Sequence, residues 1–381
     1  MVGSSTVKKE NDWILITTVV LLAAFGLVMV YSSSYVIGYD RFGDPHHFFK
    51  KQLQWIVISA VLFVVFLKIP YRFYQKIVFP IVLASIILLV LVAFTPLGIG
   101  TNGATRWLKV GPITIQPSEF VKLWMIIYLA HVYSRKQMYI NQFVKGVMPP
   151  LMIVSGIFLL IMRQPDLGTA GLIIAVAVLI VFCSGAKFIH LFLLGSFSSF
   201  IVWTYANSES YRMDRLTGFM DPFVNETGTG YQLIQSYIAI AHGGITGAGF
   251  GQSVQKLFYL PEAHTDFILA IVAEELGLFG VLFVIVCLGI IFFRGILIGV
   301  RCKNPFGSLL AFGISFQIAL QVCLNIGAVS GVLPITGIPL PFMSYGGSSL
   351  MISAVSVAIL ANISKANSLN NNSSIELDKA V

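Results

Sequence analysis

The sequence contains few charged residues. Of its 381 residues only 10% are Asp, Glu, Lys or Arg, whereas 57% are hydrophobic and the mean hydropathy is +0.87. A soluble globular protein carries about 25% charged residues. The composition therefore excludes an ordinary soluble domain. It favours a chain that crosses a bilayer several times, and each crossing needs about 20 apolar residues.

Cysteine is also scarce, and none of the four cysteines lies in a segment that we place outside the membrane. We therefore expect no disulfide framework. The first apolar run, from Trp13 to about Val36, is too long for a signal-peptide core and has no clear small-residue cleavage site. We expect it to be retained as the first membrane span.

Apolar runs predict an all-α integral membrane protein with about ten transmembrane helices. They form one polytopic membrane domain, residues 1–365, and the polar residues 366–381 predict a disordered cytoplasmic tail. The candidate spans lie at roughly 13–36, 52–69, 74–95, 117–134, 144–162, 167–184, 187–206, 264–293, 306–331 and 345–364.

The basic residues give the orientation. The net charge of +8 does not indicate nucleic-acid binding, because Lys and Arg lie in short connections between the apolar runs. With a cytoplasmic N-terminus, 14 of them lie in inner segments and 6 in short outer segments. Basic residues accumulate on the cytoplasmic side. We therefore expect both termini inside the cell.

Two outer segments are unusual. One is "GIGTNGATRWLKVGPITIQPSEF", residues 98–120, and the other is an extracytoplasmic loop at about 207–263. Within the loop, "YQLIQSYIAIAHGG" predicts an amphipathic helix whose apolar face includes Leu233, Ile234, Tyr237, Ile238 and Ala241. Such a helix lies at the membrane surface or over the bundle, or is an ordinary loop helix.

Two charged residues lie inside an apolar span. Glu119 and Lys122 are three residues apart at the start of the fourth span, which makes them neighbours on one helix face. Ionisable groups inside a membrane are costly and commonly functional. The pair is either a structural ion pair or a pair that orients a catalytic group or meets a charged substrate.

Three more outer motifs carry polar groups. In "RQPDLGT", Asp166 is expected to cap the next helix. In "YRMDRLTGF", Arg212 and Arg215 suit the oxygens of a diphosphate. In "TGIPLPFMSYGGSS", residues 336–349, the prolines and glycines interrupt any regular helix and predict the lining of a cavity.

The stretch "LPEAHTDFILAIVAEELG", residues 260–277, concentrates four acids and a histidine. On a continuous helix Glu274 lies about 80° round from Asp266 and ~12 Å deeper, and Glu275 points roughly opposite Asp266. The cluster therefore divides into Asp266 at the mouth of a cavity and a deeper pair of unassigned role. Flanked by His264, Asp266 is a candidate general base. The alternative is that it only stabilises a helix N-terminus.

These residues also carry a family resemblance. The motifs "GATRWLKVGPITIQPSEFVKL", "QPDLGT", "YQLIQSYIAIAHGGITGAGFG", "LPEAHTDFILAIVAEELG" and "PLPFMSYGGSS" follow one another from about residue 103 to 349. In this order they resemble the SEDS family (shape, elongation, division and sporulation), of the FtsW and RodA type. "LPEAHTDF" and the polar tail resemble the FtsW side.

The resemblance implies a peptidoglycan glycosyltransferase that polymerises lipid II on the outer face of the bacterial cytoplasmic membrane. It places the family's essential aspartate at Asp266 and its Glu and Lys at Glu119 and Lys122. It implies a class B penicillin-binding protein and other division proteins as partners, at the division septum. A lipid II flippase, a non-catalytic scaffold and an elongation or sporulation paralogue are the alternatives.

The site expected from these arguments combines Asp266 as catalytic base with a set of substrate-binding residues. A divalent cation, Mg or Mn, is expected to share the charge of the diphosphate, and no organic cofactor is expected. The substrate-binding residues are Arg106, Lys109, Glu119, Lys122, Arg212, Arg215, His264, Ser344, Gly346 and Gly347.

Overall fold

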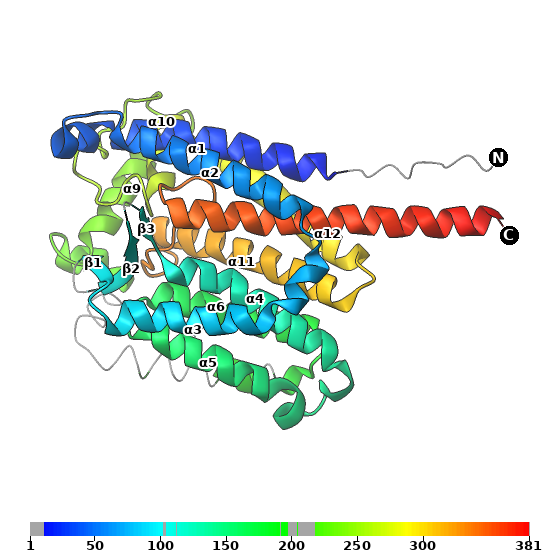
Figure 1. Ribbon diagram of the computed structural model, residues 1–381. Coiled ribbons are helices and arrows are strands. Elements are labelled where there is room, and N and C mark those ends of the chain that lie inside the picture. Colours follow the sequence, from blue (N-terminus) through cyan, green and yellow to red (C-terminus); the bar gives the residue numbers. More distant parts are fainter. Residues whose placement is uncertain are drawn as a thin grey trace.

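The computed structural model describes residues 11–101, 104–111, 113–190, 192–196, 204 and 218–380. Long helices run side by side in one bundle, and a small sheet lies at one end of it (Figure 1). The main helices are α1 Trp13–Phe42, α2 His47–Lys68, α3 Val78–Phe94, α4 Pro117–Arg135, α5 Met148–Met162, α6 Leu167–Cys183, α9 Tyr231–Gly243, α10 Ile268–Arg301, α11 Pro305–Val329 and α12 Gly347–Ala380.

A helix lies within nine of the ten predicted spans, and the chain is a helical membrane protein as expected. The other predicted span, 187–206, falls largely outside the described residues. Among those residues, six helices are long and apolar enough to cross a membrane, and α3 and α6 are shorter apolar helices. The number of ten spans and the cytoplasmic position of both termini stay predictions.

Local capping signals set where several helices begin. The Asp12 carboxylate accepts a hydrogen bond from Leu15 N at the start of α1, and Asn304 does the same for α11, where Pro305 occupies the first turn. Side-chain oxygens at these positions satisfy backbone N–H groups that have no partner within the helix. The first turns are therefore specified by the sequence alone.

A three-stranded antiparallel sheet forms within residues 98–115. Its strands are β1 Gly98–Thr101, β2 Ala104–Val110 and β3 Ile113–Ile115, in the order β1-β2-β3. The prediction of an all-α chain missed this sheet, because its strands are short and rich in glycine at their start. The sheet matters for the site because β2 carries Arg106 and Lys109.

Helix α10 differs from the continuous helix that was predicted. It begins at Ile268 instead of 264, and Gly277 interrupts it with φ 63° and ψ −155°. A Cβ at Gly277 would clash with the backbone of Gly247 and Ile245, so only glycine fits this break. The helical geometry used for Glu274 and Glu275 therefore applies only from Ile268 to the break.

Helix α9 packs on α10, and its buried face coincides with the predicted one only at Leu233. Its buried residues are Leu233, Ser236, Ala239 and Gly243, whereas Ile238 is exposed. A side chain at Gly243 would clash with the backbone of Ala273. Small residues allow this close approach, so residue size sets part of the contact face beside the apolar Leu233.

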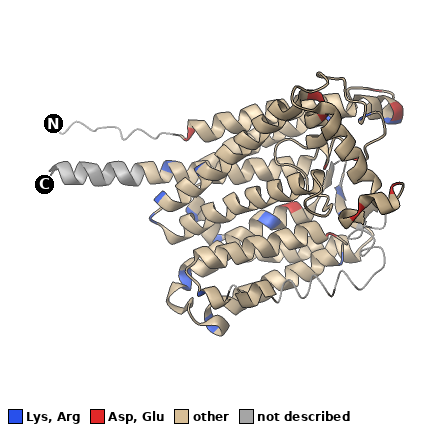
Figure 2. Cartoon of the chain, turned by 180° about the vertical axis from the view of Figure 1, so that it is seen from behind, with Lys and Arg blue, Asp and Glu red and all other residues tan. Residues whose placement is uncertain are grey.

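The two ends of the bundle differ in charge. Most acidic positions lie at the end that carries the sheet, and the end at which α1 begins shows mainly basic ones (Figure 2). This asymmetry agrees with the predicted cytoplasmic side. Helix α12 continues to Ala380, through residues whose composition predicted a disordered tail, and the division into a membrane domain and a tail stays a prediction.

Candidate active site

Asp266 lies in the turns that precede α10, and its side chain is partly buried. Asn325 of α11 donates from Nδ2 to the backbone oxygens of Asp266 and Ile338, at 2.8 Å each. A Cβ on Gly337 would lie 3.3 Å from Oδ2 of Asp266. The backbone of Asp266 is thus fixed against the loop between α11 and α12, the loop that was predicted to line a cavity.

Arg106 joins the sheet to the turn between α5 and α6. From β2 its guanidinium donates to the backbone oxygens of Gln164 (3.4 Å) and Pro165, and Nη1 lies 3.9 Å from Oδ1 of Asp166. Asp166 caps α6 by accepting from Thr169 N, which confirms its predicted role. Its Oδ2 is buried and has no hydrogen-bond partner among the described residues.

The environment of Asp266 favours a carboxyl that exchanges a proton near neutral pH. Burial raises the pKa of Asp266 to about 7. The charges of Glu262 and Asp166 raise this pKa further, and Arg106 opposes them. Glu262, Arg106 and Asp166 therefore lie close enough to act on Asp266 through their fields, and they come from three separate parts of the chain.

His264 is not available as a cation. Burial lowers the pKa of its imidazole to about 4, so the ring is neutral at physiological pH. The ring lies 4.6 Å from the ring of Phe48 and 5.6 Å from that of Tyr345, measured between centroids. Its backbone oxygen accepts from Tyr345 N. His264 therefore joins α2 to the loop before α12, and its contact with substrate stays a prediction.

Ser344, Gly346 and Gly347 belong to the segment 336–349 that was predicted to line a cavity, and two of them make contacts within the protein. Ser344 Oγ accepts from Leu340 N at 2.8 Å and holds the turn. A side chain at Gly347 would clash with the indole ring of Trp55, so α12 begins in close contact with α2. Gly346 has more space around it. For all three, binding to substrate stays a prediction.

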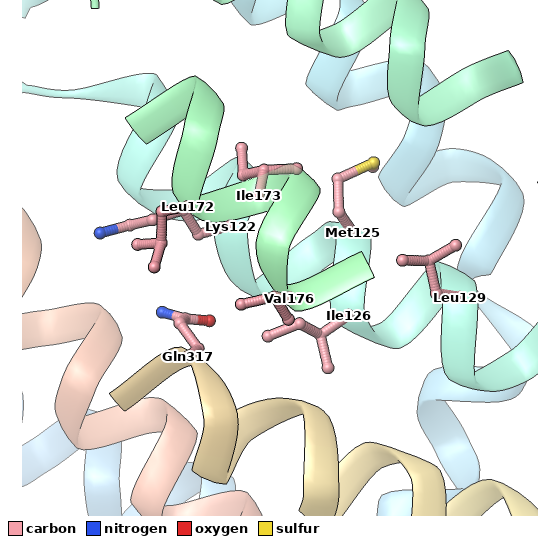
Figure 3. Close-up of a pocket in the computed structure, with 8 residues that line it drawn as sticks. All are labelled: Lys122, Met125, Ile126, Leu129, Leu172, Ile173, Val176 and Gln317. Carbon is pink, nitrogen blue, oxygen red and sulfur yellow. The ribbon is translucent and has the colours of Figure 1, made fainter. Parts of the chain in front are cut away.

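Glu119 and Lys122 form an ion pair inside the bundle. Lys122 Nζ lies 2.8 Å from Glu119 Oε1, and each residue is only 3% exposed. Lys122 and Gln317 are the polar groups in the lining of a small cavity between α4, α6 and α11 (Figure 3). At about 10 Å³ the cavity holds roughly one water molecule. This geometry supports the structural alternative for the pair, and its contact with substrate stays a prediction.

Glu274 and Glu275, whose role the sequence left open, both hold the loop that follows α9. Glu274 accepts from His242 Nδ1 (3.0 Å), Ser253 Oγ and Val254 N (2.9 Å). Glu275 accepts from Ser32 Oγ of α1 and from Lys256 Nζ, at 2.7 and 2.6 Å. Every donor except Ser32 belongs to α9 or the segment after it, so the pair anchors this loop on α10.

The structure does not bring every predicted residue to the site. Lys109 is exposed on β2, and its contact with substrate stays a prediction. Arg212 and Arg215 lie outside the described residues. Sequence reasoning missed Asn325, although an amide inside an apolar helix is a signal that can be read.

The comparisons with known proteins concern the family and the fold. A family model for FtsW, RodA and SpoVE, described as cell cycle protein, matches residues 12–369. The chain is 46% identical over 368 residues to the "Probable peptidoglycan glycosyltransferase FtsW" of Bacillus subtilis (strain 168), which covers 93% of this chain and 91% of that protein. It is 41% identical over 366 residues to "Stage V sporulation protein E" of the same organism, with 95% and 99% covered.

Solved structures share the fold. One, described as "Structural coordination of polymerization and crosslinking by a peptidoglycan synthase complex", has a chain with a TM-score of 0.76 and 27% identity, covering 94% of this chain and 98% of that chain. The rod shape determining protein RodA of Thermus thermophilus has a TM-score of 0.67 at 22% identity, with 94% and 97% covered. The likeness to RodA supports the fold alone. The match to the family model and to the relatives shows that this chain belongs to the FtsW/RodA/SpoVE family.

Proposed function

We propose that the chain is a peptidoglycan glycosyltransferase that polymerises lipid II on the outer face of the cytoplasmic membrane. One observation carries the proposal. The Asp266 carboxylate has no hydrogen bond or ion pair with any residue that the structure describes, while its backbone is fixed by Asn325. A carboxylate held in place but left without a partner is available to a substrate. The names of the relatives support the same activity.

The reaction needs one base. Asp266 takes the proton of the acceptor sugar hydroxyl as that oxygen bonds to the anomeric carbon of the donor. The bond from this carbon to the diphosphate breaks, and the diphosphate leaves with the electron pair. A single displacement turns an α-linked donor into a β-linked glycan, and this stereochemistry follows from the family's substrate. General base catalysis of this kind contributes about 10²- to 10⁴-fold to a rate.

Arg106 is the described residue best placed to receive the leaving group. Its guanidinium lies at the same end of the bundle as Asp266 and affects its pKa. Its side chain is 27% exposed, so part of it remains open to solvent. Guanidinium donors match phosphate oxygens in charge and geometry. We assign to Arg106 the stabilisation of the negative charge that develops on the diphosphate.

A divalent cation, Mg or Mn, is part of the proposal. Oδ2 of Asp166, buried and without a hydrogen bond among the described residues, offers it an oxygen ligand. Mg²⁺ is commonly bound by one or two carboxylates together with substrate phosphates. When bound, such an ion neutralises charge on the diphosphate. The described residues contain no group of three metal-binding side chains.

The proposal also includes a protein partner and a place of action in the cell. One chain of similar fold belongs to a structure described as a peptidoglycan synthase complex, which supports a class B penicillin-binding protein as partner. A division role at the septum rests on the relative named FtsW at 46% identity. The sporulation relative at 41% keeps the sporulation role as the nearest alternative.

The rival function is a flippase for lipid II, and one experiment separates the two. The purified chain, together with a class B penicillin-binding protein, receives labelled lipid II and Mg²⁺ in detergent, where no leaflets exist. We expect glycan polymer, resolved by gel electrophoresis. A parallel assay in vesicles measures movement of lipid II between leaflets. If lipid II moves between leaflets and neither assay yields polymer, the chain is a transporter and the glycosyltransferase proposal is wrong.

The rate of polymerisation is expected to rise with pH and to reach half its maximum near pH 7. The base must be ionised, and the pKa of Asp266 is raised to about 7. The measurement is the initial rate at saturating lipid II between pH 5.5 and 8.5. In Glu262→Gln the midpoint should move to lower pH, because the charge of Glu262 raises the pKa of Asp266. A rate independent of pH over this range would argue against Asp266 as the base.

A further inference from the structure

A cavity lies at the end of the bundle opposite Asp266. It has a volume of about 230 Å³ and is formed by the beginning of α1, the last turns of α10 and the part of α12 around Ser364. Its polar lining consists of Asp12, Arg294, Arg301, Ser364, Asn367 and Ser368. None of these residues belongs to the proposed active site.

The charges in this cavity do not balance. Arg294 donates from Nη2 and Nε to Oδ2 of Asp12, at 2.6 and 3.2 Å, and the other oxygen of Asp12 caps α1. The carboxylate is thus occupied by one arginine and by the hydroxyl of Ser364, which donates to Oδ2 at 3.5 Å. The side chain of Arg301 is exposed, and its guanidinium has no ion-pair or hydrogen-bond partner among the described residues. Two guanidinium groups and one carboxylate leave one positive charge for a ligand to neutralise.

The two arginines face the cavity together. They are seven residues apart in α10, which is close to two full turns, so they share one face and lie about 10 Å apart along the helix axis. Nη1 of Arg294 makes no hydrogen bond with a described residue. Leu297, between them, contributes an apolar wall. An anion that enters between the arginines is therefore close to two guanidinium groups at different heights along α10, and to the α12 side of the cavity.

We propose that this cavity binds the phosphate of an anionic glycerophospholipid from the inner leaflet. The basic end of the bundle is the predicted cytoplasmic side, and anionic lipids give that leaflet its negative surface potential. Basic pockets between transmembrane helices on this side bind such headgroups. At about 230 Å³, compared with about 10 Å³ for the cavity beside Lys122, the volume is enough for a headgroup phosphate and its neighbouring atoms.

A bound headgroup would connect three helices. The phosphate would contact α10 through Arg301 and Arg294 and α12 through Ser368, while Arg294 and Ser364 already bind Asp12 at the start of α1. A ligand that binds only the folded chain stabilises it in proportion to its saturation. The proposal is independent of the glycosyltransferase activity, because it concerns the opposite end of the molecule.

The test is a binding titration with the full chain in detergent. Phosphatidylglycerol is added stepwise, phosphatidylcholine serves as the zwitterionic comparison, and the bound lipid is counted by native mass spectrometry. We expect Arg301→Gln to weaken phosphatidylglycerol binding by about tenfold or more, since charged hydrogen bonds are lost. The matched control Lys303→Gln removes the same charge two residues away, outside the cavity, and should change binding less than about twofold.

Three further results decide the proposal. Equal losses in the two variants would assign the binding to general surface charge and overturn it. Inorganic phosphate or glycerol phosphate that binds as tightly as the lipid, with the same dependence on Arg301, would make the ligand a soluble phosphate and also overturn it. Unchanged polymerisation by Arg301→Gln, together with reduced lipid binding, supports a site that is separate from the chemistry.

Discussion

Replacing Asp266 by Asn is expected to lower the rate of lipid II polymerisation by about 10²- to 10⁴-fold, the usual contribution of a general base. Asn keeps the size of the side chain but cannot accept the proton of the acceptor hydroxyl. The measurement is the initial rate of glycan formation by the purified complex with its transpeptidase partner. The control is Glu262→Gln, a neighbouring exposed carboxylate in the same turn, which should keep most of the activity at pH 8.

The loss in Asp266→Asn should come without unfolding. The carboxylate makes no bond to the described residues, and the contact that fixes the position uses the backbone oxygen, which the substitution leaves in place. The melting temperature of the variant should therefore remain within about 2 °C of the original, as for other changes away from packing contacts. A variant that retains more than about a tenth of the activity would show that another group is the base.

Breaking the buried pair of Glu119 and Lys122 is expected to cause the largest loss of stability. In Glu119→Gln the ammonium of Lys122 stays buried without its carboxylate, and such a change costs about 3–5 kcal/mol. The free energy of unfolding in detergent, from denaturant titration, is the quantity to compare. The double variant Glu119→Gln/Lys122→Met removes both charges and should recover most of the loss, because an apolar replacement avoids the unpaired charge.

The same double variant separates the two roles that the sequence left open. If the pair only holds the bundle, the double variant should regain activity together with stability. Regained stability without activity would show that the pair orients a catalytic group or meets the substrate. If the double variant is as unstable as Glu119→Gln, the stabilising contact is something other than the ion pair, and the expectation for stability is wrong.

The sequence predicted those features that depend on neighbouring residues. The apolar runs placed helices in nine of the ten expected spans, because the length of an apolar run is a local property. The spacing of Glu119 and Lys122 predicted a neighbouring pair, and "RQPDLGT" predicted that Asp166 caps α6. Both contacts are present in the structure. Asp266 was singled out by its position, and family resemblance strengthened that choice.

Features that depend on residues far apart were decided by the tertiary structure. The periodicity of α9 predicted an apolar contact face, whereas its buried face includes Ser236, Ala239 and Gly243. Gly243 lies against the backbone of Ala273 in α10, where a larger residue would clash. Within "LPEAHTDFILAIVAEELG" the sequence separated Asp266 from Glu274 and Glu275 but left the role of that pair open. Donors from the loop after α9, which the helical periodicity does not predict, assign the pair to holding this loop.

What the sequence determined by itself is the helical membrane architecture and the identity of the acid to test first. Only the tertiary structure decided which residues surround that acid. They are Arg106 from the sheet, Asp166 from the turn before α6 and Asn325 from α11. Local sequence patterns predict which helix faces are apolar and where helices begin. They do not predict which distant residues come into contact, because that depends on how the helices pack. The pKa of Asp266 depends on such distant residues.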